Sequence, residues 1–276
     1  MTIKEISQQS SSGVSLWGQV WAPEGDIRAV VVLVHGLGEH VQRYQYVAEK
    51  MNARGIVLLG FDQQGHGKSG GKRGVINSGQ GLMEDISGAI KLARQMYPGL
   101  PVFIYGHSMG ALEVLYYGLH GSETLKGIIA TSPPLDTNSM SKAQRSMVGV
   151  LKKLLPNLAV DNGLSIDGLS RDATCNQAYR DDPLVHPKAS MRLAGFMSDG
   201  AIDIMQHAND WTIPLYLAHG SADALCPIAG SDRFAEVLGS KVTYKRWDGL
   251  FHETHNEPEK DVVIAAMLDW IDSQLS

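Results

Sequence analysis

Cysteine is scarce in this sequence, and long apolar runs are missing. The chain has two cysteines, Cys175 and Cys226, among 276 residues. Two cysteines cannot supply a disulfide framework or a four-cysteine zinc site, so neither organises the fold. No apolar stretch approaches the ~18 residues that suggest a membrane span. The N-terminal segment is polar and lacks the apolar core of a secretory signal. We therefore expect a reducing, cytoplasmic setting.

An excess of positive charge is also missing. Lys and Arg number 24 against 29 Asp and Glu, which gives a formal net charge of −5. A nucleic-acid-binding protein needs a basic surface, so we expect no nucleic-acid partner. Hydrophobic residues make up 43% of the chain and charged residues 19%, which is an ordinary globular composition. Large α/β folds commonly reach this length as one unit.

Short apolar runs of strand length alternate with longer helical patterns along most of the chain. The run Ala29–Gly36 is continuous and β-branched, as in a strand buried on both faces, whereas Val14–Ala22 alternates like an antiparallel edge strand. This alternation predicts an α/β fold with a mostly parallel central sheet flanked by helices. The other expected strands are residues 55–62, 101–108, 126–132, 213–220 and 241–247, and the expected helices are residues 44–53, 81–96, 111–119, 230–238 and 261–275.

The alternation stops between residues 134 and 210, where the sequence has no convincing buried strand. In the segment Arg145–Leu158 the apolar residues recur at helical spacing; these are Met147, Val148, Leu151, Leu154 and Leu155. We interpret residues 134–210 as a helical cap inserted over the sheet, and residues 1–133 and 211–276 as the core. A plain packing face is the alternative role for the apolar side chains of this segment.

Two G-x-S-x-G motifs occur, and such a motif alone is weak evidence. Gly106–Gly110 contains Ser108, follows a buried-strand pattern and precedes a helical one. A nucleophile elbow requires this order, because the serine must stand exposed above the sheet. Gly67–Gly71 contains Ser69 but has no helical pattern beside it, so Ser69 is expected in a loop. Nucleotide binding there is rejected, because Asp62 stands where a P-loop has its first glycine.

A serine nucleophile needs a histidine base and a carboxylate that orients the histidine. In folds with such an elbow, the acid and then the base follow the serine along the chain. Asp223 and His252 both come directly after expected strands, at the carboxyl edge of the sheet where Ser108 also lies. Asp223 is favoured over Asp248, which we place in the turn that leaves the last strand. His255 competes with His252, and the residues alone leave that choice open.

Acyl transfer also needs hydrogen-bond donors for the developing oxyanion. One donor is the amide after the nucleophile, here Met109, and the other comes from the loop after an early strand. The segment VHGLGEH follows an expected strand, which makes Leu37 the second candidate, with a simple tight turn as the alternative. No cofactor is needed for this chemistry. The sequence HETH does not predict a metal, because its histidines are three residues apart in a loop, whereas zincins space them by four on a helix.

Several of these motifs together resemble one known family. The segments HGLGEH, FDQQGHGKSGGKRG, GHSMGA, HGSADALCP and GLFHETHNEPEK are similar to the monoglyceride lipase group of α/β-hydrolases, a lysophospholipase-like set of serine hydrolases. The likeness runs from about Val14 to Asp269 and includes the segment Ala178–Leu193. It implies a helical cap that guides an acyl chain to the serine and can rest on a lipid surface. Cys226 matches a cysteine near the active site in that family, although a small buried hydrophobe is the simpler role.

The resemblance also assigns the site residues. Ser108, Asp223 and His252 match the catalytic triad, so the choice between the two histidines of HETH falls on His252. Leu37 and Met109 match the oxyanion hole. We therefore expect a carboxylic ester hydrolase that works through an acyl-enzyme, with a monoacylglycerol lipase that releases fatty acid and glycerol as the leading hypothesis.

Several alternatives stay open. Lysophospholipase and small- or aryl-ester hydrolase activities remain as alternatives within enzymes. The shape of the pocket lined by the cap decides among them, and the sequence does not give that shape. An aminopeptidase would need an acidic cluster in the cap, and we interpret Asp181 and Asp182 as solvated loop charges. A binding module without catalysis is the alternative from another class. The expected partner is a small-molecule acyl ester, and the oligomeric state is not predicted. Basic residues beside the apolar cap positions could favour a lipid surface, although a solvated helix face is preferred; these are Lys142, Arg145, Lys152 and Lys153.

Overall fold

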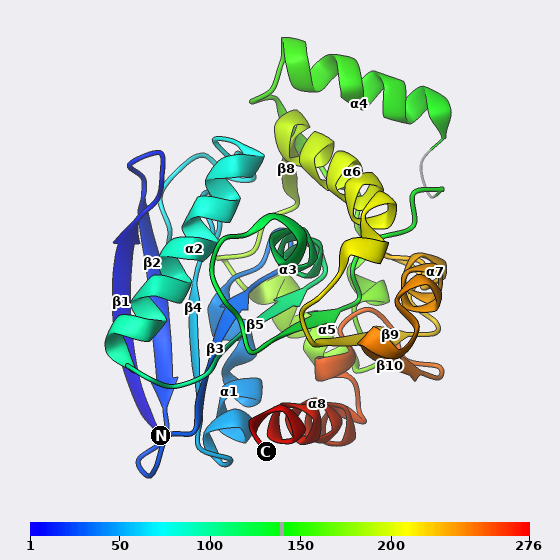
Figure 1. Cartoon of the computed structure of the whole chain (residues 1–276). Helices are drawn as coiled ribbons and strands as arrows, with labels where there is room; N and C mark the ends of the chain where they lie inside the picture. The colour runs from blue at the N-terminus through cyan, green and yellow to red at the C-terminus, as the bar shows by residue number, and fades with distance from the viewer. Residues whose placement is uncertain (139–140) are drawn as a thin grey trace.

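A twisted, mostly parallel sheet forms the centre of the protein in the computed structural model, which describes residues 1–138 and 141–276 (Figure 1). Within these residues the strand order is β1-β2-β4-β3-β5-β6-β9-β10. The pairs β1–β2 and β2–β4 are antiparallel, and the remaining neighbours are parallel. The strands are β1 (Thr2–Gln9), β2 (Ser15–Ala22), β3 (Ala29–Val34), β4 (Ile56–Phe61), β5 (Val102–His107), β6 (Gly127–Thr131), β9 (Leu215–Gly220) and β10 (Val242–Trp247).

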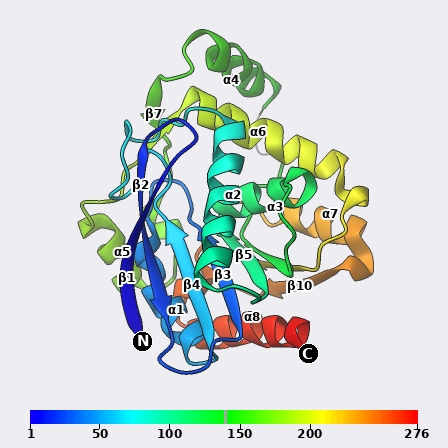
Figure 2. The ribbon, with the colours of Figure 1, turned by 60° about the vertical axis from the view of Figure 1, so that its left-hand side comes forward.

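Helices cover both faces of the sheet (Figures 1 and 2). The helices α1 (Gln45–Asn52) and α8 (Lys260–Leu275) bury apolar side chains against one face. The opposite face carries α2 (Gly79–Met96), α3 (Met109–His120) and α7 (Ala229–Leu238). Side chains alternate along a strand. In β3, Val30, Val32 and Val34 therefore pack on the face covered by α2, α3 and α7, whereas Val31 and Leu33 pack on the face covered by α1 and α8. Burial on both faces explains the continuous apolar run that predicted this strand.

The expected α/β-hydrolase fold is confirmed, with two differences among the strands. All seven predicted strands form, but β1 lies outside β2, so the prediction that residues 14–22 form an edge strand is wrong. No strand pattern predicted β1, because most of its side chains are exposed and, of its apolar residues, only Ile6 packs partly buried against the core. Its pairing with β2 is held by the backbone ladder from Thr2 opposite Ala22 to Gln9 opposite Ser15.

The predicted helices also form. The five core helices agree with their expected ranges to within about two residues, the usual uncertainty of a helix end. The helix expected over residues 145–158 is instead α4 (Lys142–Leu154). It begins with a capping box at Ser141 and ends before Pro156, which disfavours helical geometry in the residue that precedes it. No helix in the described residues is long and apolar enough to cross a membrane.

The insertion leaves the sheet after β6 and returns at β9, two strands that pair directly. It contains α4, α5 (Ala173–Asp181), α6 (Met191–Gln206) and a small antiparallel pair, β7 (Ala159–Asp161) with β8 (Lys188–Ser190). Helix α6 packs across α3, and its Leu193, Ala201 and Ile204 join the same apolar core as that helix. Helix α4 lies farther out, on the other side of α6 (Figure 1).

An acidic side chain of α3 is buried in the core beside α2. Glu113 of α3 is 1% exposed and lies beside Gln63. Burial, reinforced by the negative charge of Asp85, raises the pKa of Glu113 well above its usual value, and contact with Gln63 only partly opposes this. The folded protein therefore keeps a proton on Glu113 at pH values above the ordinary pKa of a glutamate, where the unfolded chain has already released it.

We predict that Glu113→Gln makes stability less dependent on pH. At this group the wild-type protein binds more protons when folded than when unfolded. Its free energy of unfolding therefore falls by up to about 1.4 kcal/mol per pH unit once Glu113 of the unfolded chain is ionised. The neutral isostere removes that cost. The Tm of Glu113→Gln relative to wild type should therefore rise between roughly pH 5 and pH 8 in thermal unfolding. Glu84→Gln, on the exposed face of α2, is the matched control, and a Tm difference that is flat with pH would contradict the prediction.

Candidate active site

The predicted nucleophile lies on a sharp turn between β5 and α3. Ser108 has φ 54° and ψ −119°, in the left-handed half of the backbone map that favours glycine. The flanking glycines are required by crowding: a Cβ on Gly106 would lie 2.2 Å from the carbonyl oxygen of Gly110, and one on Gly110 would lie 2.0 Å from that of Val34. The backbone of this turn therefore presses against the end of β3. Ser69 of the second motif is a buried loop residue, as expected, and its hydroxyl donates to the backbone of Asp62.

Asp223 and His252 meet at the carboxyl edge of the sheet. The Nδ1 of His252 lies 2.7 Å from Oδ2 of Asp223, and both side chains are almost fully buried. The other oxygen of Asp223 accepts the backbone amides of Leu225 and Cys226. Burial would raise the pKa of Asp223, but His252 and His219 outweigh it and hold the pKa below its usual value. Burial would likewise lower the pKa of His252, but Asp223 raises it above its usual value.

The competing residues lie elsewhere. Asp248 accepts a hydrogen bond from Ser221 and is exposed. His255 stacks on Tyr44 at a centroid distance of 5.0 Å, and neither of its nitrogens has a hydrogen-bond partner among the described residues. His219 contacts the hydroxyl of Ser231 and also lies 3.1 Å from the carboxylate of Asp223.

The loop that carries His252 is fixed by the neighbouring strand end. Ser132, directly after β6, has φ 51°, and its hydroxyl donates to the carbonyl of His252 at 2.7 Å. Its amide donates to the carbonyl of Ala218 in β9. The amide of Ser108 in turn donates to Thr131 at the end of β6. Three adjacent strand ends therefore hold the serine and the histidine by backbone and hydroxyl bonds.

Both predicted oxyanion donors lie next to Ser108. A Cβ on Gly36 would lie 3.3 Å from the Cβ of Ser108, so the loop after β3 runs directly against the serine. Leu37 lines the same cavity as Ser108, and Met109 begins α3. In the part of the chain that the structure describes, neither of their amides donates a hydrogen bond outside a helix or strand. Cys226 is buried, its thiol is within hydrogen-bonding reach of the Ser108 side chain, and burial raises its pKa.

A buried ion cluster joins the two loops of the site, and sequence reasoning missed it. The guanidinium of Arg43 binds both carboxylate oxygens of Glu253 at 2.7 Å and Oε2 of Glu39 at 2.6 Å. The other oxygen of Glu39 accepts the amide of Gly36 at 2.6 Å and the hydroxyl of Tyr44. Burial would raise the pKa of Glu253, but Arg43 outweighs it and holds the pKa below its usual value. Glu39 lies inside the motif HGLGEH and Glu253 inside HETH, beside the candidate site residues. Their position in these motifs is the feature of the sequence that could have predicted a role in the site.

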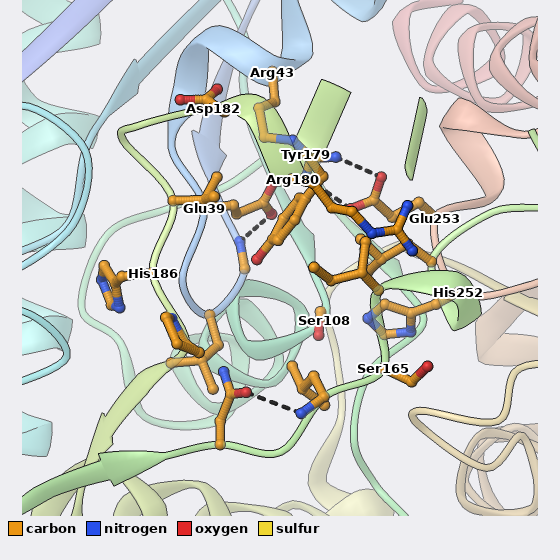
Figure 3. A pocket seen from close by; sticks show the side chains of 18 of the residues that line it. Glu39, Arg43, Ser108, Ser165, Tyr179, Arg180, Asp182, His186, His252 and Glu253 are labelled. Atoms are coloured by element: carbon orange, nitrogen blue, oxygen red, sulfur yellow. Dashed lines mark hydrogen bonds and ion pairs between the residues drawn. The ribbon is translucent and has the colours of Figure 1, made fainter. Parts of the chain in front are cut away.

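These residues open onto a cavity of about 280 Å³ (Figure 3). Ser108 and His252 line it together with Glu39, Arg43 and Glu253. The insertion contributes residues between 162 and 187, namely Asn162, Leu164, Ser165, Ile166, Leu169, Tyr179, Arg180, Asp182, Val185, His186 and Pro187. Among the residues that the structure describes, helix α4, whose apolar pattern suggested the cap, contributes none to this lining. The lining is thus a mixture of apolar and charged side chains.

Asp182 differs from its expected role as a solvated charge. Its Oδ2 lies 2.8 Å from Nε2 of His40, its Oδ1 accepts the amide of Leu184, and its side chain is 25% exposed. Asp181 is exposed, as expected. In the described residues, the grouping with metal-ligand chemistry is His120, Asp203 and His207, which does not line the cavity.

Comparison with known proteins gives several similar chains. The chain is 35% identical over 277 residues to a monoacylglycerol lipase of Mycolicibacterium smegmatis, with 99% of both chains covered. Its structure resembles that of a monoacylglycerol lipase of Paleococcus ferrophilus with a TM-score of 0.86 and 32% identity, covering 94% of this chain and 99% of that one. It also shares the fold of a Saccharomyces cerevisiae monoglyceride lipase variant in complex with a substrate analog, with a TM-score of 0.90, 20% identity and coverage of 100% and 97%.

A family model described as "Serine aminopeptidase, S33" matches residues 25–259. This range includes every predicted site residue and the whole insertion. The chain therefore belongs to this family of α/β-hydrolases, in the group that contains the monoacylglycerol lipases, and it is a serine ester hydrolase.

Proposed function

We propose that the protein is a monoacylglycerol lipase that hydrolyses its substrate through an acyl-enzyme on Ser108. The observation that carries this proposal is the 2.7 Å contact of His252 Nδ1 with Asp223 at the edge of the cavity that Ser108 also lines. Since Nδ1 faces the carboxylate, Nε2 is the nitrogen left to accept the serine proton. Similarity to monoacylglycerol lipases supports the substrate class.

The reaction follows from these positions. Ser108 Oγ attacks the ester carbonyl while His252 takes its proton, and Asp223 stabilises the resulting imidazolium. The oxyanion accepts hydrogen bonds from the amides of Leu37 and Met109, each worth about 2.7–4 kcal/mol in a preorganised site. His252 then protonates the leaving glycerol oxygen, and the acyl group stays on Ser108. Water activated by His252 attacks the acyl-enzyme and releases the fatty acid.

The ion cluster of Glu39, Arg43 and Glu253 positions both halves of this machinery. Glu39 of the cluster holds the amide of Gly36, which precedes the proposed oxyanion donor Leu37. Glu253 of the cluster is itself the residue after His252, so its bonds to Arg43 fix the loop that carries the proposed base. One guanidinium lies between two carboxylates, so the cluster carries a surplus negative charge. That charge lies beside His252 and favours the imidazolium that forms during the reaction.

The size and lining of the cavity support a polar head group inside and an acyl chain that leaves it. About 280 Å³ lies just below the roughly 300–1,000 Å³ typical of ligand pockets, so the cavity cannot enclose a long chain as well. Leu164 lines the cavity and is also 41% exposed, so it offers an apolar side chain at the point where an acyl chain could pass from the cavity to the surface. Further exposed apolar residues of the insertion are Met147, Val150, Leu154, Leu155, Leu158 and Val160.

These exposed residues support transient contact of the insertion with a lipid surface. Apolar side chains beside basic ones are typical of interfacial helices, and Lys153 of α4 is exposed. Lys152 extends over α6 to Asp199. The Lys142 side chain lies outside the described part of the chain. On this basis residues 134–210 act as the cap over a core of residues 1–133 and 211–276.

The acidic lining favours one second candidate. Glu39, Glu253 and Asp182 line the cavity, and an aminopeptidase would need such carboxylates for the amine of its substrate. Arg43 and His40 bind these carboxylates here, which leaves less negative charge for an amine. We therefore keep ester hydrolysis as the main proposal and include an aminopeptidase substrate in its test.

The proposed function makes a prediction about substrate choice. We expect turnover to be fastest on monoacylglycerols in a panel that also contains lysophosphatidylcholine, short p-nitrophenyl esters and an aminoacyl p-nitroanilide. Ser108→Ala should lower kcat by at least about a thousandfold, because it removes the nucleophile. Ser69→Ala, in the second G-x-S-x-G motif, should keep kcat while lowering Tm, since it loses only its bonds to Trp17 and Asp62.

Different results would redirect the assignment. Turnover restricted to short esters would reject the lipase and keep Ser108 as the nucleophile. Cleavage of the anilide alone would favour the aminopeptidase. Full activity in Ser108→Ala would overturn the mechanism.

The proposed mechanism also predicts how activity depends on pH. Only neutral His252 can accept the serine proton, so kcat/KM falls as the pH drops below the raised pKa of His252. Glu253→Gln removes a negative charge that raises this pKa, so the acid limb of the kcat/KM profile should move to lower pH, by up to about one unit. Asp248→Asn, which removes an exposed charge from the same region, should leave the limb in place. An unmoved limb in Glu253→Gln would show that the cluster does not act on His252.

A further inference from the structure

The two exposed histidines of this chain lie next to each other. The chain has ten histidines, and eight of them are buried: His35, His40, His66, His107, His186, His219, His252 and His255. The remaining two are His120, the last residue of α3, and His207, directly after α6. Their ring centroids are 5.9 Å apart, and the mechanism proposed above uses neither of them.

A carboxylate lies between the two rings. Asp203 of α6 has Oδ2 at 2.5 Å from Nε2 of His120 and Oδ1 at 3.3 Å from Nδ1 of His207. One ligand atom from each of the three side chains lies within 4.8 Å of the others. Two imidazole nitrogens and one carboxylate oxygen are ligands that Zn²⁺ commonly takes in proteins.

We propose that His120, Asp203 and His207 form a surface binding site for Zn²⁺. Tetrahedral zinc with bonds of about 2.0–2.1 Å needs ligand atoms roughly 3.3 Å apart, so the three groups need to move by only about an ångström. The side chains are 38%, 29% and 46% exposed, which gives them room for this adjustment and leaves the fourth position to water. Nitrogen ligands select Zn²⁺ and related transition-metal ions over Ca²⁺ and Mg²⁺.

The surrounding structure already orients the three groups. Asp203 and His207 are four residues apart at the end of α6, so they lie on the same face of that helix. His120 packs against the ring of Tyr116 at a centroid distance of 4.5 Å, and Tyr116 packs in turn on Phe196 of α6. The site thus joins the last turn of α3 to the last turn of α6.

The position of the site gives the ion a structural effect. Helix α3 begins directly after Ser108, and α6 belongs to the insertion that roofs the cavity. An ion held by both helices stabilises the folded protein, because the three ligands are brought together only in the folded chain. It does not contact the cavity, so we expect it to raise Tm and to leave kcat nearly unchanged.

Isothermal titration of the full chain with Zn²⁺ at neutral pH, in a chelator-free buffer, tests the site. We expect binding of one ion per chain and a rise in Tm of a few degrees with saturating Zn²⁺. Asp203→Asn and His207→Ala should each weaken binding by at least about tenfold and remove the Tm shift. Asp199→Asn is the matched control: it lies one turn earlier on α6, contacts Lys152 instead of a histidine, and should bind Zn²⁺ like the wild type. Ca²⁺ should not bind.

Two results would overturn the proposal. The first is no binding heat and no Tm shift in the wild type at millimolar Zn²⁺. The second is unchanged binding in both Asp203→Asn and His207→Ala, which would place the ion at another site. Both readouts are independent of turnover, so a failure of the proposed lipase activity would not affect them.

Discussion

Close backbone packing at the start of α3 constrains the rest of the site. Gly110 has room for no side chain, because the carbonyl oxygen of Val34 lies 2.0 Å from where a Cβ would be. The end of β3 and the β5–α3 turn are therefore in direct contact, and the loop after β3 must run past Ser108. The proposed nucleophile and the proposed oxyanion donors are thus brought together by one steric condition. The strained backbone at Ser108 follows from the same crowding.

Residues with a local signal could be predicted from the sequence. The core strands are apolar on both faces, so their sequences are continuous apolar runs. The turn around Ser108 could be recognised because two glycines flank the serine between a strand pattern and a helix pattern. Asp223 and His252 follow strands, and parallel strands end at the same edge of the sheet. The order of elements therefore predicted that these two side chains would meet, although nothing in the sequence gives their 2.7 Å separation.

Features that depend on distant partners could not be predicted. Strand β1 is polar on most positions and is held by its backbone ladder with β2, which leaves no periodic pattern. Arg43 and Glu253 look like ordinary surface charges until the fold buries them against each other. The part of the cavity lining that the insertion supplies could not be predicted either, since it comes from the segment between α4 and α6, where strand and helix patterns are weak. The apolar pattern of α4 belongs to a helix that, in the described part of the chain, contributes no residue to the cavity lining.

The pairing of Arg43 with Glu253 ties the loop after β3 to a segment far along the chain. The two residues are 210 positions apart, so the loop after β3 gains this support only when the C-terminal region has folded. Asp223 and His252 likewise come late in the chain, after the elbow and the insertion. The segment that carries the proposed base also carries the partner of Arg43, so the two depend on the same late part of the fold. In the proposed mechanism, the serine elbow therefore becomes competent for ester hydrolysis only after the segment with His252 and Glu253 has packed against the loop after β3.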